Sequence, residues 1–359
     1  MRVYNFSAGP SMMPLAVLEE AQKDFIDYKG SGMSVTEFSH RSKWYEEIHF
    51  GFMSLLRELM NIPDEYEIVL MGGGASTQFE AVPLNLLGEK AQADYIVSGN
   101  FSKKAYKFAE RYGDIKLVYS AEENNYTDLP DFKKSDFRND SVYLHITGNN
   151  TIFGLAYDKV PECDIPVVAD LSSGILGKKY DVKEYGLIYA GAQKNIAPAG
   201  VTVVIVRKDM LKPMAACPKM LNYSTHIDGD NLFNTPPVFP IYMGYLNLKY
   251  MKAQGGVDAF EKINNEKAGM LYDFIDNSAL YKNNVNPRYR SIMNVPFVTP
   301  SKELDAKFIT EAAQNGLVNI KGHKLVGGMR ASIYNGMPIE GVKALISFMK
   351  KFETENKQA

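Results

Sequence analysis

The sequence has few of the residues that stabilise secreted proteins. Only two cysteines, Cys163 and Cys217, occur in 359 residues, and one disulfide would be a poor framework for so long a chain. We therefore expect two reduced thiols, as in a cytosolic protein. The first residues lack the apolar run of a signal peptide, and no stretch approaches the roughly 20 continuous apolar residues of a membrane helix. These absences predict a cytoplasmic protein that has no membrane partner.

An excess of either charge is also missing, because 40 lysines and arginines face 42 aspartates and glutamates. A dedicated nucleic-acid binder would carry a basic excess, so nucleic acid is not expected as a partner, although a local basic pocket for a small anion fits this balance. Neither internal repeats nor low-complexity linkers occur. At about 150 residues per domain the length predicts two domains, and so long a chain forms a core without a metal. No metal site is expected.

What the sequence does contain is a series of short apolar runs that end at glycines or polar residues. The runs are continuous rather than alternating, which is typical of strands buried on both faces of a parallel sheet. Helix-like stretches lie between them, and this alternation predicts an α/β fold in which ligands gather beyond the carboxyl ends of the strands. The predicted strands are 67–71, 93–97, 141–146, 165–169, 187–190 and 201–206. The polar segments that close the runs are 72–78, 100–101, 147–151, 170–173 and 193–194.

The last third of the chain shows a different pattern. Helical apolar patterns extend over 263–275 and 339–349, and strand-like runs occur at 295–298 and 328–333. This mixture predicts a second, smaller α+β unit. The expected domains are a large one over 15–245 and a small one over 246–359 that includes the N-terminal arm 1–14.

Lys194 and Asp170 each follow a predicted buried strand. A partly desolvated lysine at a strand end can have a lowered pKa and act as an amine nucleophile, although most lysines are simply solvated. Burial would raise the pKa of Asp170 unless the side chain met a cation. A pyridinium nitrogen is such a cation, and enzymes that use pyridoxal phosphate (PLP) commonly set an aspartate against it. The alternative for Asp170 is a helix N-cap, but the two residues together favour a PLP site.

Three glycines at 72–74 close the first run and precede a helix-compatible stretch. Glycines let backbone N–H groups approach an anion, and a helix N-terminus favours phosphate. Ser76 and Thr77 could add hydroxyl donors. No Gly-Lys-Ser/Thr motif follows and the Gly-x-Gly-x-x-Gly pattern is absent, so neither a nucleoside triphosphate nor a dinucleotide is indicated. An ordinary tight turn is the alternative.

The remaining candidates depend on the cofactor assignment. Phe101 could stack on a flat ring or belong to the core. Thr151 could donate to a phenolic oxygen or be an ordinary turn hydroxyl. Five basic side chains could bind a carboxylate or phosphate, arginine bidentately, or could be surface charges. These side chains are His40, Arg41, His323, Lys324 and Arg330.

Seven segments carry a resemblance to a known family. They are NFSAGP at 5–10, SHR at 39–41, GGGASTQF at 72–79, YAGAQKN at 189–195, FNTPP at 233–237, MNVPF at 293–297 and GGMRASIYN at 327–335. Over essentially its whole length the chain resembles the phosphoserine aminotransferases, a family in the class V group of fold-type I PLP enzymes. The resemblance implies a large domain with a mainly parallel seven-stranded sheet flanked by helices, a smaller C-terminal α+β domain, and a homodimer with PLP near the subunit interface.

The resemblance also implies an activity on small molecules. The family exchanges O-phospho-L-serine and 2-oxoglutarate reversibly with 3-phosphohydroxypyruvate and L-glutamate, a step of serine biosynthesis. In some organisms it also transaminates 4-phosphohydroxy-L-threonine on the route to pyridoxine.

Residue by residue, the resemblance implies that Lys194 forms the Schiff base with PLP and that Asp170 pairs with the pyridine nitrogen. Thr151 would reach the ring oxygen and Phe101 would stack on the ring. The residues implied at the PLP phosphate are Ala75, Ser76 and Gln193, with Asn234 and Thr235 from the other subunit. Arg330 would clamp the substrate α-carboxylate. The residues implied at the substrate phosphate or distal carboxylate are His40, Arg41, His323 and Lys324.

Three positions depart from the pattern of many relatives. Phe101 stands where many have tryptophan, so stacking should survive but weaken. Some relatives carry an arginine in the glycine loop where this chain has 75–77, which puts one phosphate contact in doubt. Lys324 stands where relatives often have arginine, and lysine lacks the bidentate fork, so phosphate affinity could fall.

Three other functions compete with this interpretation. The first is another class V PLP enzyme, such as a different aminotransferase or a cysteine desulfurase. A desulfurase needs an activated cysteine, and neither Cys163 nor Cys217 has an obvious activating neighbour. A non-catalytic protein of the same fold is disfavoured because Lys194 and Asp170 are both present. A nicotinamide-dependent oxidoreductase is disfavoured because the dinucleotide motif is missing.

Overall fold

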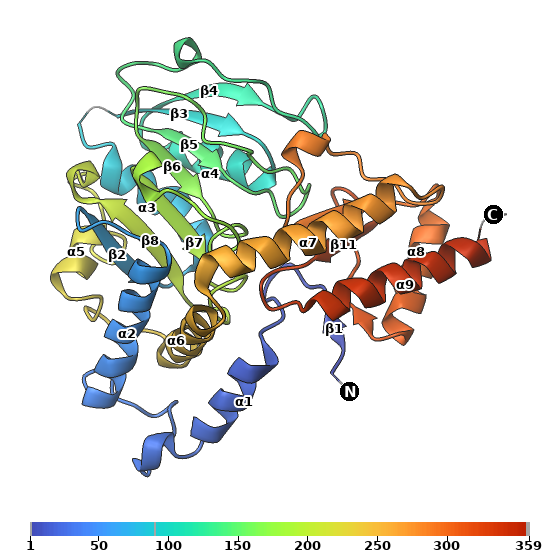
Figure 1. The fold of residues 1–359 in the computed structure, drawn as a ribbon. Coiled ribbons are helices and arrows are strands. Elements are labelled where there is room, and N and C mark those ends of the chain that lie inside the picture. Colours follow the sequence, from blue (N-terminus) through green and yellow to red (C-terminus); the bar gives the residue numbers. More distant parts are fainter. Residues whose placement is uncertain (1, 90, 357–359) are drawn as a thin grey trace.

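A seven-stranded sheet forms the centre of the larger part of the molecule (Figure 1). The computed structural model describes residues 2–89 and 91–356. Strand β8 runs antiparallel to both its neighbours, and the other neighbouring strands are parallel, so the expected mainly parallel sheet is confirmed. In spatial order the strands are β2 (Tyr66–Met71), β8 (Thr202–Arg207), β7 (Leu187–Gly191), β6 (Val167–Asp170), β5 (Leu144–Thr147), β3 (Gln92–Val97) and β4 (Asp114–Ser120).

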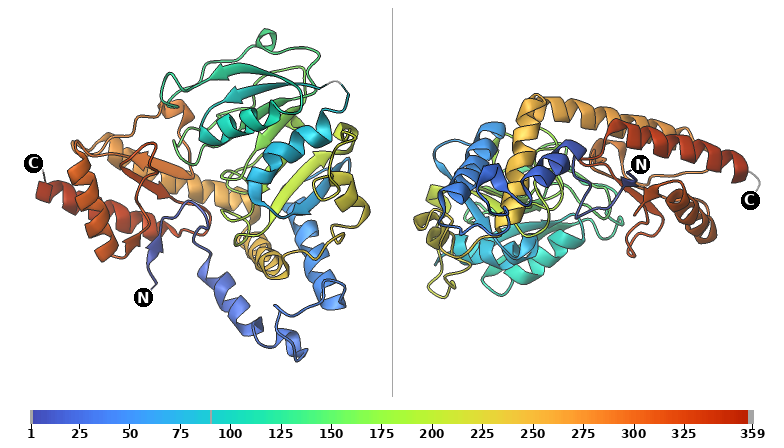
Figure 2. Two further views of the ribbon diagram at one scale, coloured as in Figure 1. Left: turned by 180° about the vertical axis from the view of Figure 1, so that it is seen from behind. Right: turned by 90° about the horizontal axis from the view of Figure 1, so that it is seen from below.

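Helices cover both faces of this sheet. Successive strand residues point to opposite faces, so Ile68 and Ile205 join the core formed with α1, α2 and α6, whereas Val69 and Val204 join the core formed with α3 and α4. Seen from behind, α3 and α4 lie in front of the sheet (Figure 2). This double burial is the physical reason for the continuous apolar runs. The helices are α1 (Leu15–Asp24), α2 (Lys43–Leu59), α3 (Gly74–Leu86), α4 (Asn100–Ala109), α5 (Tyr223–Asp228) and α6 (Val238–Ala253).

All six predicted strands are present, with ends shifted by a few residues. The apolar pattern does not predict β4, the seventh strand. It lies at the edge of the sheet, and all its residues are exposed or only partly buried. An edge strand needs no continuous apolar run, so its sequence carries a weaker signal.

A second, smaller unit combines the C-terminal third with the first residues of the chain. Its core includes Phe6 and Met12 together with residues of the segment 268–352. Strands β9 and β11 pair antiparallel, and β1 pairs parallel with β10. The elements are β1 (Tyr4–Asn5), α7 (Gly256–Asp276), β9 (Asn294–Phe297), α8 (Lys302–Gln314), β10 (Leu317–Val318), β11 (Met329–Ser332) and α9 (Ile339–Asn356).

Helix α7 joins the two units (Figure 1). Val257 and Phe260 near its start pack in the core of the larger unit, and Ala268 and Leu271 pack in the core of the smaller one. Helix α6 passes through residue 245 without a break, and the domain boundary placed there stays a prediction. Among the described residues, no helix combines the length and apolarity needed to cross a membrane.

Candidate active site

A cavity of about 350 Å³ lies at the carboxyl ends of β5, β6 and β7. The first turns of α3 and α4, strand β11 and the N-terminal arm complete its walls. This is the edge of the sheet at which ligands are expected. Nine predicted site residues line it: Ala75, Ser76, Phe101, Thr151, Asp170, Gln193, Lys194, His323 and Arg330.

Lys194 lies in the turn that follows β7, partly exposed to this cavity. Its Nζ donates a hydrogen bond of 2.6 Å to Thr151 Oγ1 and lies 5.9 Å from the centre of the Phe101 ring. Burial lowers the pKa of Lys194 to about 8; the nearby Asp170 carboxylate opposes this shift and the Arg330 guanidinium adds to it. A substantial fraction of this amine is therefore unprotonated near neutral pH, as a nucleophile or proton acceptor requires.

The N-terminal arm holds the Lys194 turn from outside. The Ser11 N–H donates to the carbonyl of Gln193 over 3.0 Å, and the Ser11 hydroxyl donates to the carbonyl of Lys194. Gln193 folds back over Gly191, where a Cβ would come within 2.5 Å of its Oε1. Only glycine fits at 191 without moving Gln193.

Asp170 ends β6 next to β7 and is only 5% exposed. Its Oδ1 accepts hydrogen bonds from the backbone N–H of Ser172 at 2.9 Å and from the Ser172 hydroxyl at 2.6 Å. Burial raises the pKa of Asp170, while the Lys194 ammonium and the two bonds from Ser172 oppose that shift. Its Oδ2 has no hydrogen-bond partner among residues 2–89 and 91–356, so an acceptor is available to a ligand.

The first turn of α3 forms another wall. Gly73 has a φ of +85°, and a Cβ there would come within 2.0 Å of Thr77 Oγ1, so glycine is required. The Thr77 hydroxyl donates to the Gly73 carbonyl over 2.9 Å. Ala75 and Ser76 therefore present first-turn backbone N–H groups, which have no intrahelical partner, to the cavity. This arrangement suits an anion.

Two basic side chains of the smaller unit reach the cavity. Arg330 on β11 donates from Nη1 to the carbonyl of Thr151 over 3.4 Å, and its buried Nε has no hydrogen-bond partner among the described residues. His323 lies in the loop before β11, and burial together with the charges of Arg330 and Lys324 lowers its pKa. The cavity is thus cationic on the side facing the smaller unit.

The remaining predicted site residues do not line this cavity. His40 and Arg41 lie in the loop before α2, and Asn234 and Thr235 lie in the loop between α5 and α6. Lys324 is exposed beside His323. These five residues carry no contact with Lys194 in the described chain, so their predicted roles depend on a second subunit or on the substrate.

Some cavity residues were not predicted individually. Ser172, Ser173 and Asn149 lie in segments that close predicted strands, but nothing in a single sequence says which polar residue of such a segment faces a ligand. Lys104, one helical turn from Phe101, also lines the cavity. The sequence did contain a signal for Lys104, because residues three apart on a helix lie on the same face and Phe101 was predicted to stack on the ring.

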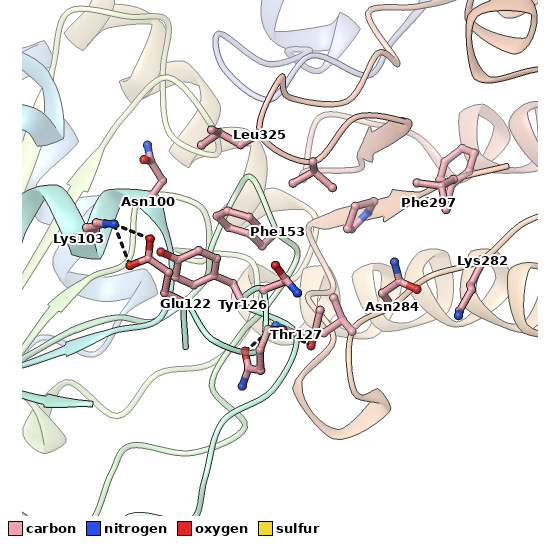
Figure 3. A pocket seen from close by; sticks show the side chains of 16 residues that line it. Asn100, Lys103, Glu122, Tyr126, Thr127, Phe153, Lys282, Asn284, Phe297 and Leu325 are labelled. Atoms are coloured by element: carbon pink, nitrogen blue, oxygen red, sulfur yellow. Dashed lines mark hydrogen bonds and ion pairs between the residues drawn. The ribbon is translucent and has the colours of Figure 1, made fainter. Parts of the chain in front are cut away.

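A larger cavity lies elsewhere. It measures about 720 Å³ and separates the loop 122–127 and Phe153 from residues of the smaller unit (Figure 3). Asn100 lines both cavities, but none of the predicted site residues lines the larger one. It is a cleft between the two units, and size alone therefore does not identify the chemical site.

The desulfurase alternative can be compared with the structure. Burial raises the pKa of both Cys163 and Cys217, and neither lines the Lys194 cavity. A reactive cysteine requires the opposite shift, which argues against a desulfurase. Within the described chain, no three His, Cys, Asp or Glu side chains gather in a group that could hold a metal ion.

Comparison with known proteins identifies the family. Residues 3–345 match the Aminotransferase class-V family. A phosphoserine aminotransferase of Bacillus cereus is 51% identical over 99% of both chains. A solved phosphoserine aminotransferase studied for radiation damage of its Schiff base superposes with a TM-score of 0.95 at 45% identity, over 99% of this chain and 100% of the other. A PLP-bound phosphoserine aminotransferase from Trichomonas vaginalis has a TM-score of 0.91 at 36% identity, over 97% and 100%.

A match of this extent leaves no part of the fold unaccounted for. The chain belongs to the aminotransferase class-V family, within its phosphoserine aminotransferase branch.

Proposed function

We propose that the protein is a PLP-dependent aminotransferase that exchanges O-phospho-L-serine and 2-oxoglutarate with 3-phosphohydroxypyruvate and L-glutamate, in serine biosynthesis. One observation carries this proposal. The adjacent strands β6 and β7 bring a buried acid, Asp170, and an amine of lowered pKa, Lys194, to one cavity whose opposite walls suit anions. The relatives of the same name support the choice of substrates.

The residues of the cavity fit PLP. When bound, PLP supplies an aldehyde that condenses with amines and a ring that accepts the electron pair released at the substrate Cα. The first turn of α3, at Ala75 and Ser76, would hold the phosphate together with Gln193. The vacant Oδ2 of Asp170 would receive the ring N–H, and a cation there removes the cost of burying this carboxylate. Thr151 would donate to the ring oxygen and Phe101 would lie against the ring face.

Lys194 would carry the proton transfer. Once an incoming amine has displaced it, its Nζ can take the proton from the substrate Cα and return it on the other side of the exchange. Thr151 Oγ1, 2.6 Å from Nζ, holds the amine over the cavity in the meantime. A pKa of about 8 leaves both protonation states populated at neutral pH, as a group that accepts and donates in turn requires.

Arg330 would bind the α-carboxylate that all the substrates share, because its guanidinium is buried with a donor to spare. His323 lies on the same side of the cavity and would face the group that differs, a phosphate or a distal carboxylate. Lys324 would add a point charge there rather than a bidentate fork. The same site could accept 4-phosphohydroxy-L-threonine, which carries the same phosphate, in pyridoxine biosynthesis.

A cytoplasmic homodimer would supply the missing contacts. His40, Arg41, Asn234 and Thr235 lie outside the Lys194 cavity of their own chain. They have exposed apolar neighbours in sequence, and such surfaces mark association sites. Two copies could then complete each other's sites, with Asn234 and Thr235 at the PLP phosphate and His40 and Arg41 at the substrate. The exposed apolar side chains are Phe25, Ile26, Met33, Phe50 and Phe233.

The visible absorbance spectrum of the purified protein with PLP tests this proposal. We expect a yellow band that bleaches with phosphoserine and returns with 2-oxoglutarate, and no such band in Lys194→Ala. A band that responds only to another amino acid would support PLP as the cofactor but contradict the proposed substrate. The absence of a band after PLP is added to the wild type would overturn the proposal.

A further inference from the structure

We propose that Ser172 is a positioning residue that holds the carboxylate of Asp170 and the turn carrying Lys194 in one fixed arrangement. This inference rests on the proposed function and concerns how the two reactive groups stay aligned with each other. Ser172 is 5% exposed and lines the cavity.

The Ser172 hydroxyl makes two hydrogen bonds with opposite roles. It donates to Asp170 Oδ1 over 2.6 Å, and it accepts from the backbone N–H of Gly191 over 3.0 Å. Its own backbone N–H donates to the same Oδ1 over 2.9 Å. One hydroxyl proton and one lone pair are therefore both used, and the hydroxyl rotor is fixed.

This hydroxyl continues the hydrogen bonding between β6 and β7 beyond the last backbone–backbone bond. The N–H of Leu171 donates to the carbonyl of Tyr189 over 2.9 Å, the last bond between β6 and β7. The next donor on β7 is Gly191, but the carbonyl of Leu171 already accepts from the N–H groups of Gly174 and Ile175 at 2.9 and 2.8 Å. The Ser172 side chain accepts from Gly191 instead, so a side chain continues the ladder at the point where the backbones separate.

The consequence concerns both reactive groups. Gly191 is the last residue of β7 and lies three positions before Lys194. No other side chain in residues 2–89 and 91–356 hydrogen-bonds to Asp170. Removal of the Ser172 hydroxyl would thus loosen the carboxylate and the Lys194 turn together, while Arg330 and the substrate-facing wall keep their contacts. Misplacement of catalytic groups lowers the rate more than it weakens substrate binding.

The test compares Ser172→Ala with the wild-type holoenzyme. We expect PLP to bind about tenfold more weakly, since a hydrogen bond to a charged group is lost, and kcat to fall about tenfold while the KM for phosphoserine changes by less than about twofold. Ser172→Thr keeps the hydroxyl and should restore both values. PLP affinity is read from the visible band during titration of the stripped protein and does not depend on turnover.

Ser141→Ala is the matched control. The Ser141 hydroxyl donates to Asp94 Oδ1 over 2.8 Å, both residues are buried, and neither lines the cavity. It should leave PLP affinity and kcat unchanged. If Ser172→Ala gives no folded protein while Ser141→Ala does, Ser172→Cys, with a weaker donor, replaces it and should show the same losses in smaller degree.

Two results would overturn the inference. One is a Ser172→Ala enzyme with the PLP affinity and kcat of Ser141→Ala; the other is a Ser172→Thr enzyme as impaired as Ser172→Ala, which would indicate packing alone. A wild-type protein that shows no visible band with PLP would instead overturn the proposed function, so the two failures are distinguishable.

Discussion

Two lysines whose pKa is lowered by burial have different surroundings in the molecule. Lys194, at the sheet edge of the larger unit, donates one hydrogen bond, to Thr151, and faces a cavity. Lys267, on α7 in the smaller unit, is fully buried, and its ammonium donates to the carbonyls of Ile333, Tyr334 and Met337 at 2.9, 2.9 and 3.0 Å. Burial lowers the pKa of Lys194 to about 8 and that of Lys267 to about 7.

The comparison shows that neither burial nor a lowered pKa identifies a reactive lysine. The two lysines differ in how many of their N–H donors already bind the protein. An ammonium has three donors, and Lys267 uses all of them to join α7 to the segment that follows β11. Arg330 resembles Lys194 in this respect, since its buried Nε has no partner among the described residues. Both of these cations line the cavity and have N–H donors that no described residue uses.

The largest expected effect separates the two lysines by activity. Lys194→Ala should reduce turnover by at least about a thousandfold, because it removes the group that we propose moves the Cα proton, and should leave the unfolding transition nearly unchanged. Steady-state kinetics and thermal unfolding measure the two quantities. Transaminase activity near that of the wild type would contradict the assignment of Lys194.

Arg330→Ala should raise the KM of phosphoserine and of glutamate alike by about a hundredfold, because both share the α-carboxylate that we propose Arg330 binds with charge-assisted hydrogen bonds. Initial rates with each substrate in turn provide the measurement. A loss confined to phosphoserine would place Arg330 at the substrate phosphate and weaken the link between vacant donors and the shared carboxylate.

Lys267→Met should lower stability and leave turnover nearly unchanged, the opposite of the effects expected for Lys194→Ala. Three buried carbonyls lose their donor, so the free energy of unfolding should fall by about 2 kcal/mol, a factor of about 30 in the folding equilibrium constant. The kcat of the folded protein should remain within about twofold of the wild type. Urea titration measures the free energy of unfolding and steady-state kinetics measures kcat. An unchanged free energy of unfolding together with a lost kcat would indicate that Lys267 takes part in the reaction.

The smallest effect concerns pH. PLP uptake by the stripped protein needs the unprotonated amine of Lys194, so its rate should rise about tenfold from pH 7 and level off above about pH 8. Asp170→Asn should move this profile to lower pH, because the carboxylate charge raises the pKa of Lys194. Stopped-flow absorbance gives the rates. Lys267→Met should leave the midpoint unchanged, and a rise that continues toward pH 10 would contradict the lowered pKa.

The sequence predicts the reactive pair because strand burial has a strong signal. Lys194 and Asp170 each follow a continuous apolar run, and parallel neighbours bring their ends together. Seven of the nine predicted residues that line the cavity end or follow strands of the central sheet, whereas His323 and Arg330 reach it from the smaller unit. The family resemblance supplied the remainder, including the residues that no strand end indicates.

Other features have no local signal. The spacing of α7 places Lys267 on the buried face of the helix with Phe260 and Leu271, but no neighbouring residue indicates its acceptors, which only the path of residues 333–337 reveals. The link from Ser172 to Gly191 depends on where two strands diverge. Similarly, β4 is an edge strand without a continuous apolar run. Each of these features is set by contacts between distant segments, which a pattern in one window of sequence does not contain.

The contacts of the N-terminal arm determine when, during synthesis, the cavity can be completed. Tyr4 pairs with Leu317, the Ala8 carbonyl accepts from the Tyr334 hydroxyl over 2.9 Å, and Ser11 holds the Lys194 turn. On a ribosome adding roughly 5–20 residues per second, the arm is translated roughly 15–60 s before its last partners. A nascent chain that has already formed the whole sheet still lacks Arg330 and the anchors of the arm. The cavity is therefore complete only after the segment that contains Arg330 and Tyr334 has been translated.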